Sequence, residues 1–214
     1  MIKKISYSLA VIVAIAVVVI ATRPSSFSIE RSRQIEAPPE VAFGFVDDLH
    51  RWSGWSPWEK MDPQMTRTFE GAESGVGAIY AWKGNDQVGE GRMTITASQP
   101  NELVEIQLEF LKPWAASNRV IFRFTPNEDG TNVVWRMEGE NDFFGKAFSM
   151  FFDMDAMVGK DFDEGLASLG DLAKAEAEKR AAEEKKRQEE EAAAAAEAAE
   201  AAEATEEGAV AREE

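Results

Sequence analysis

Cysteine is absent from this 214-residue chain, and histidine occurs only once. Without cysteine there is no disulfide, no thiolate nucleophile and no sulfur ligand for a metal. A single histidine and no nucleophile-elbow pattern also argue against hydrolytic triads and histidine-based zinc sites. The formal net charge of −16 argues against nucleic-acid binding, because an acidic protein repels phosphate backbones. We therefore expect no metal, no cofactor and no nucleic-acid partner.

Large apolar side chains are missing from residues 174–214, which consist mostly of Ala, Glu, Lys and Arg. Ala and Glu favour helix, but nothing in this segment could be buried or form a coiled-coil seam. We predict a helical to disordered tail over 174–214, solvated and helical to about Ala204. A docking segment for a basic protein partner is the alternative, and the sequence does not identify that partner.

One long apolar run lies near the beginning of the chain. Residues 5–22 carry no charge, follow Lys3 and Lys4, and are long enough to cross ~30 Å of hydrocarbon. The run exceeds the apolar region of a usual signal peptide, although a cleaved signal or a buried helix are alternatives. We predict an N-terminal transmembrane helix over 1–23 in a single-pass membrane protein. Positive charges flank both ends of the run, and we place the N-terminus inside and the domain on the extracytoplasmic side.

The middle of the chain, roughly 150 residues, has the size of one domain. A strand is predicted at 27–36 and a short amphipathic helix at 41–49, followed by a Trp-rich irregular segment at 52–58. Closely spaced strands joined by short turns then favour an antiparallel meander. These strands are predicted at 65–69, 76–82, 88–98, 103–111, 117–125 and 131–140.

A long helix is predicted from Asp142 to about Asp171. Because no second helical layer is predicted, its natural partner is the concave face of the sheet. The expected fold class is α+β, a curved antiparallel sheet of about seven strands around one long C-terminal helix. A sheet that grips one helix tends to enclose a pocket, so the pocket is where we expect the functional site.

At 100° per residue around the helix axis, one narrow apolar stripe forms on this helix. It consists of Phe144, Phe148, Phe151, Phe162, Leu166 and Leu169. Asp155 falls in the middle of the stripe, facing the expected pocket. A structural ion pair with a strand arginine, such as Arg92 or Arg136, is the simplest explanation of this carboxylate. A polar anchor for a ligand and a general acid or base are the alternatives.

Three segments carry a family resemblance: residues 37–58 (APPEVAFGFVDDLHRWSGWSPW), 73–95 (ESGVGAIYAWKGNDQVGEGRMTI) and 143–169 (FFGKAFSMFFDMDAMVGKDFDEGLASL). They resemble the START-like or SRPBCC superfamily, the polyketide cyclase/dehydrase and lipid-transport group with a helix-grip fold. The resemblance covers about 26–173, which we predict to be the domain. It implies a shared cavity rather than a shared catalytic motif.

We therefore expect a membrane-tethered protein that binds a hydrophobic small molecule or lipid in an internal cavity, through apolar burial and one or two polar groups. A polyketide cyclase/dehydratase-like enzyme using a cavity carboxylate is one alternative. A non-catalytic protein-interaction module is the other. No catalytic residue is assigned. The predicted ligand-binding residues are Trp82, Met93, Trp135, Phe144, Phe148, Phe152 and Asp155.

Overall fold

A computed structural model describes residues 2–210 of the chain; of the side chains at 2–6, 8, 9 and 197–210 nothing is described. The chain divides into two compact units, residues 1–173 and 174–214. The first unit holds the sheet and the helices that pack on it. The second is the C-terminal part of the last helix, where ion pairs such as Arg180–Glu176 link successive turns.

The predicted membrane anchor forms a helix, α1 (Ile2–Ala21). Within the described part of the chain, no helix combines the length and the apolar character that a membrane span requires. The structure therefore does not support a transmembrane helix at 1–23, and several side chains of that segment lie outside the described residues.

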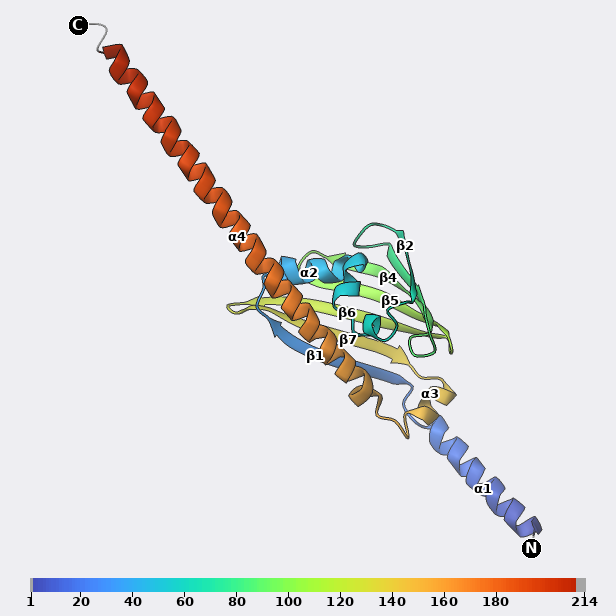
Figure 1. The fold of residues 1–214 in the computed structure, drawn as a ribbon. Helices are drawn as coiled ribbons and strands as arrows, with labels where there is room; N and C mark the ends of the chain where they lie inside the picture. The colour runs from blue at the N-terminus through green and yellow to red at the C-terminus, as the bar shows by residue number, and fades with distance from the viewer. Residues whose placement is uncertain (1, 211–214) are drawn as a thin grey trace. The chain divides into compact units, whose positions relative to one another are not determined.

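A single seven-stranded antiparallel sheet dominates the first unit (Figure 1). Strands β2 to β7 follow one another as a meander, as predicted, and β1 pairs with β7 along its whole length. The α+β fold class with about seven strands is thereby confirmed. The strands are β1 (Ser26–Ile35), β2 (Thr66–Gly71), β3 (Ala78–Lys83), β4 (Glu90–Gln99), β5 (Leu103–Lys112), β6 (Ala116–Asn127) and β7 (Gly130–Glu140).

Between β1 and β2 lie the helix α2 (Pro39–Asp47) and two short 3-10 helices, η1 (Leu49–Gly54) and η2 (Pro57–Lys60). Trp52 and Trp55 are buried there. Their indole Nε1 groups donate hydrogen bonds to backbone oxygens of α2, at 2.9 and 3.1 Å. These two bonds fasten the Trp-rich segment to α2, so it closes one side of the core as a packed plug.

The long helix predicted from Asp142 onward is in fact two helices, α3 (Phe143–Phe148) and α4 (Met154–Val210). Asp142 accepts a hydrogen bond from the Gly145 backbone at 2.7 Å and so caps α3. Asp153 accepts one from the Ala156 backbone at 3.0 Å and caps α4. An aspartate cap satisfies backbone N–H groups that begin a helix, so the second cap starts a new helix where the prediction had a continuous one.

The first turns of α4 pack on the same face of the sheet as α2 (Figure 1). Phe162, Leu166 and Leu169 are almost fully buried there, as half of the predicted apolar stripe requires. The ring of Phe162 stacks on Trp135 of β7, with centroids 4.1 Å apart and planes 7° from parallel. This contact joins the helix to the middle of the concave face.

An arginine of β1 holds the beginning of α4 from the side. The Arg31 guanidinium donates to the Asp155 carboxylate at 3.0 and 3.1 Å and lies 3.4 Å from the Asp163 carboxylate. Gly159 lies between the two acids on one helical face, where an added Cβ would come within 1.9 Å of the guanidinium. The missing side chain therefore makes room for the arginine.

Replacing Gly165 by Ala should destabilise the domain, because the new Cβ would lie 2.7 Å from Cζ3 of the stacked Trp135 ring. Gly170→Ala is the matched control, since its added Cβ would meet Ile35 and Arg33 only at ordinary contact distances of 3.6 to 4.0 Å. Both changes bring the same helix-propensity gain of about 1 kcal/mol. We expect Gly165→Ala to lower the free energy of unfolding by about 1–3 kcal/mol relative to Gly170→Ala, measured by urea denaturation. Equal stability would contradict tight helix–sheet packing.

Candidate ligand-binding site

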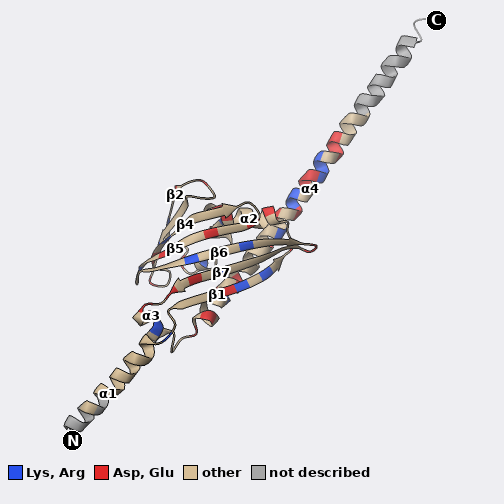
Figure 2. Cartoon of the chain, turned by 180° about the vertical axis from the view of Figure 1, so that it is seen from behind, with Lys and Arg blue, Asp and Glu red and all other residues tan. Residues whose placement is uncertain are grey.

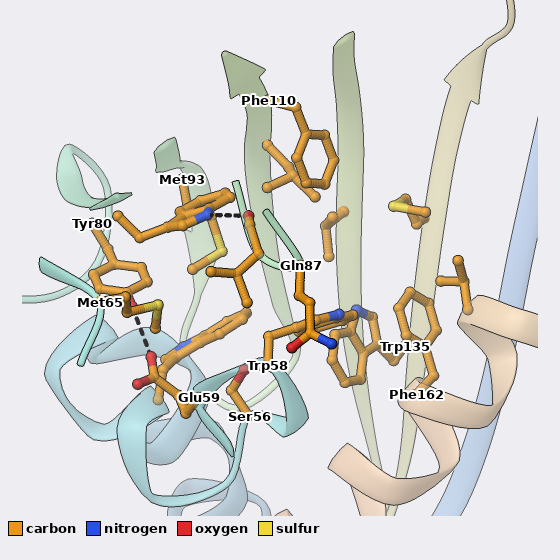
Figure 3. A pocket seen from close by; sticks show the side chains of 17 residues that line it. Ser56, Trp58, Glu59, Met65, Tyr80, Gln87, Met93, Phe110, Trp135 and Phe162 are labelled. Atoms are coloured by element: carbon orange, nitrogen blue, oxygen red, sulfur yellow. Dashed lines mark hydrogen bonds between the residues drawn. The ribbon is translucent and has the colours of Figure 1, made fainter. Parts of the chain in front are cut away.

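A cavity of about 200 Å³ lies between the concave face of the sheet, the Trp-rich segment and the start of α4 (Figure 3). Its walls are mainly aromatic and aliphatic side chains from β3 to β7. Strand alternation explains this lining, because every second residue of each strand faces the cavity while its neighbours face solvent.

Three of the residues predicted to bind a ligand line this cavity, namely Trp82 of β3, Met93 of β4 and Trp135 of β7. The Trp82 indole is fixed by a 2.9 Å hydrogen bond from its Nε1 to the backbone oxygen of Val88. The three side chains thus line the same cavity from different strands, and their contact with a ligand is still a prediction.

Phe144, Phe148 and Phe152 do not line the cavity, contrary to the sequence prediction. They are exposed, with Phe144 at 79%. The reason is the interruption between α3 and α4, which takes the first half of the apolar stripe out of phase with the second half. A continuous helix would have presented all of these rings to the sheet.

Asp155 is also not in the cavity. Its side chain is 59% exposed, and the hydrogen bond from Arg31 holds the pKa of its carboxyl below the ordinary value. The ion pair expected for this residue exists, but its partner is neither Arg92 nor Arg136. Those two arginines lie on the other face of the sheet, where each pairs with a glutamate of a neighbouring strand.

A carboxylate that the sequence interpretation overlooked lies at the cavity instead. Glu59 of η2 is 8% exposed and lines the cavity. One of its oxygens accepts a hydrogen bond from Nε of Arg67 at 2.7 Å, and the other accepts one from the Tyr80 hydroxyl at 2.7 Å. Arg67 thus balances the charge, and Tyr80, which also lines the cavity, orients the carboxylate (Figure 3).

The phenol of Tyr80 is kept neutral by its surroundings. Burial raises its pKa far above the ordinary value, and the hydrogen bond to Glu59 adds to the rise. The hydroxyl is therefore a donor to Glu59 at neutral pH. Each carboxylate oxygen has two lone pairs, so the oxygen that Tyr80 occupies can accept a second hydrogen bond from a ligand hydroxyl.

The cavity reaches the surface beside the turn between β3 and β4. Gln87 in that turn is exposed, whereas Val88, Phe110 and Val158 are half-buried at the rim. Trp58 is half-buried as well and packs edge-on against Trp135, with ring centroids 5.7 Å apart. Of the three clustered tryptophans, Trp55 is buried in the core, whereas Trp52 and Trp58 also line the cavity.

The residues that the structure describes include no group of three His, Asp or Glu side chains arranged to hold a metal ion. The polar groups at the cavity are instead Glu59, Tyr80, Ser56 and Gln87. The indole Nε1 of Trp135, which also lines the cavity, has no hydrogen-bond partner among the described residues. Together these groups can exchange hydrogen bonds with a bound molecule, inside walls that are otherwise apolar.

The curved sheet that grips a C-terminal helix around a cavity defines a helix-grip domain. Residues 26–174 match the family described as polyketide cyclase / dehydrase and lipid transport. The match extends over most of the chain, and the chain belongs to this family. The expected membership is thereby confirmed. No curated protein matches the chain.

Solved structures with the same fold are distant in sequence. A Staphylococcus aureus protein of unknown function, SA2116, is 12% identical with a TM-score of 0.53, over 72% of this chain and 97% of its own. The Aha1 protein of Colwellia psychrerythraea, solved as a dimer, is 19% identical with a TM-score of 0.51, over 69% and 96%. The di-domain ARO/CYC protein StfQ of the steffimycin biosynthetic pathway is 15% identical with a TM-score of 0.51, over 74% and 52%. At these identities the likeness shows the fold alone.

Tyr80 should resist ionisation as long as the domain is folded. Its folded pKa is raised above the unfolded value near 10, so its contribution to stability is complete below about pH 10 and declines at higher pH. The chain has two tyrosines, so Tyr7→Phe leaves Tyr80 alone. We expect no phenolate absorbance at 295 nm near pH 10 in the folded variant, and a normal titration in urea. A normal titration of the folded variant would contradict the buried hydrogen bond.

Proposed function

We propose that this domain binds a compact, mainly apolar molecule that carries one hydroxyl group. The observation that carries the proposal is the buried Glu59–Tyr80 pair at the edge of a largely apolar cavity. Apolar burial supplies affinity at about 25 cal/mol per Å², and the polar pair orients the ligand. The void also argues against a purely structural interaction module, which would need no internal space.

The size of the cavity limits the ligand. A volume of about 200 Å³ exceeds the ~150 Å³ of apolar cavities that hold benzene. It lies below the usual ~300–1,000 Å³ of ligand pockets. A molecule of one or two rings therefore fits, whereas a lipid with two acyl chains would need the walls to open. Within the range of ligands considered from the sequence, this favours a small molecule over a whole lipid.

Tethering to a membrane is a separate part of the proposal. It rests on the uncharged sequence of residues 5–22, whose helix α1 carries exposed apolar side chains such as Val11, Ile12 and Ile15. A helix that is apolar on all sides is typical of a lipid or protein interior. We place the domain on the extracytoplasmic side of that membrane.

A cyclase or dehydratase activity is the second candidate, favoured by the presence of a carboxylate and a phenol at the cavity. Glu59 and Tyr80 would take the roles that the sequence suggested for Asp155, which lies outside. An enzyme of this type should lose turnover in Glu59→Gln, whereas a carrier should keep most of its apolar affinity.

Binding can be tested with 2-naphthol and naphthalene, which share a two-ring apolar body and differ by one hydroxyl. A hydrogen bond to a charged group is worth about 1.5–3 kcal/mol, so we expect 2-naphthol to bind at least about tenfold more tightly, measured by isothermal titration calorimetry. In Glu59→Gln, the affinities for 2-naphthol and naphthalene should approach one another, because the charged acceptor is gone. Equal binding of the two probes to the unchanged protein would contradict the proposed recognition of a ligand hydroxyl group.

The location of the site is tested by filling it. Val120→Phe places a ring in the cavity wall, and Ile79→Phe adds the same ring to a strand position that does not line the cavity. Only the first should abolish binding of both probes. Circular dichroism of both variants distinguishes a filled cavity from an unfolded domain. Retained binding in a folded Val120→Phe variant would place the site elsewhere.

A further inference from the structure

One end of the sheet gathers most of the exposed aromatic side chains of the first unit. The strand register aligns Ser26 with Glu140, Phe110 with Ala116 and Phe110 with Gly91. The start of β1, the end of β7 and the turns β3–β4 and β5–β6 therefore share this end. The end of α1 leads into it, and α3 leaves from it (Figure 1).

We call this surface the aromatic end. Its members are large apolar side chains in α3, in the link to α4 and at the β5–β6 turn, and none of them lines the cavity. Trp114, Phe144 and Phe151 are 82%, 79% and 81% exposed. Isolated exposed apolar residues are normal on a protein, but a group of this kind marks an interaction site. The aromatic end consists of Leu111, Trp114, Phe143, Phe144, Phe148, Phe151 and Phe152.

The aromatic end continues into a second apolar surface. Helix α3 contacts α1, and the described part of α1 exposes Val13, Val17 and Val18 as well as residues further along its length. Figure 2 shows no charged residue along that part of α1. The two surfaces are therefore contiguous, and what covers one is suited to cover the other.

A lipid bilayer is the occupant that fits both. A protein partner would need a shape that surrounds a helix and also matches a group of rings, whereas acyl chains adapt to both. Aromatic side chains also favour the interface between lipid and water. The net charge of the whole chain, −16, disfavours binding to anionic lipid, so we attribute the attraction to apolar burial rather than to charge.

We propose that the aromatic end docks on a zwitterionic bilayer. The rim of the cavity, with Gln87, Val88 and Phe110, belongs to the same end of the sheet. Docking therefore directs the mouth of the cavity toward the membrane, and an apolar ligand can pass between lipid and cavity without crossing water. This last consequence rests on the proposed binding function, whereas the docking itself does not.

The absence of cysteine allows a direct test on the full chain. Phe151→Cys and Trp114→Cys place a single thiol at the aromatic end, and Asp129→Cys places one in the exposed β6–β7 turn at the opposite end of the sheet. Each variant is labelled with the environment-sensitive dye NBD and mixed with phosphatidylcholine vesicles that contain a nitroxide lipid. We expect the NBD emission to shift to the blue and to be quenched at positions 151 and 114, with neither change at position 129. High salt should not reduce these changes.

The possible outcomes separate the proposals. If the protein co-floats with the vesicles but the dye at 151 and 114 behaves as it does at 129, docking of the aromatic end is wrong. In that case α1 alone binds the protein to the membrane. Failure to float would overturn both docking and tethering. If instead 2-naphthol shields the dye at 151 and lipid does not quench it, the segment closes over the cavity and the docking proposal is wrong. Binding of 2-naphthol is measured separately, without vesicles, so a failure of the proposed binding function is distinguished from a failure of docking.

Discussion

The stack of Phe162 on Trp135 is the contact on which the architecture of the cavity depends. It fixes the distance between α4 and the concave face, and Trp135 is at the same time a wall of the cavity. Gly165 lets the helix approach the six-membered ring of the same tryptophan. Buried aromatic pairs add about 0.5–1.5 kcal/mol to their large apolar burial, so this one contact both stabilises the domain and sets the space that remains open.

Charge is distributed in a way that keeps this space apolar. The arginines of the central strands pair with glutamates on the outer face, and Arg31 pairs with acids at the edge of α4. Among the residues that the structure describes, Glu59 is the one acidic side chain that lines the cavity, and Arg67 and Tyr80 satisfy it. A buried charge without partners is costly, so this group is retained only because its surroundings neutralise it, which makes it the most informative polar feature of the site.

Much of the fold could be predicted from the sequence, because strand alternation and turn residues are local signals, and each predicted strand lies within a few residues of the observed one. The break between α3 and α4 could not, since it depends on the Asp153 cap prevailing over a continuous apolar stripe. The partner of Asp155 could have been predicted, because strand alternation with the buried Ile29 and Ile35 places Arg31 on the inner face of β1. Glu59 gave no comparable signal: a buried tyrosine needs a partner, but its acceptor comes from a distant segment.

The pairing of β1 with β7 has a consequence for how the chain acquires its structure. The first strand made by the ribosome must wait for the last one, so the sheet is completed only when nearly the whole domain has emerged. A pairing across so long a stretch of chain forms slowly, because loop-closure entropy precedes the favourable contacts. During this interval β1 has an open edge, which is prone to pairing with other chains.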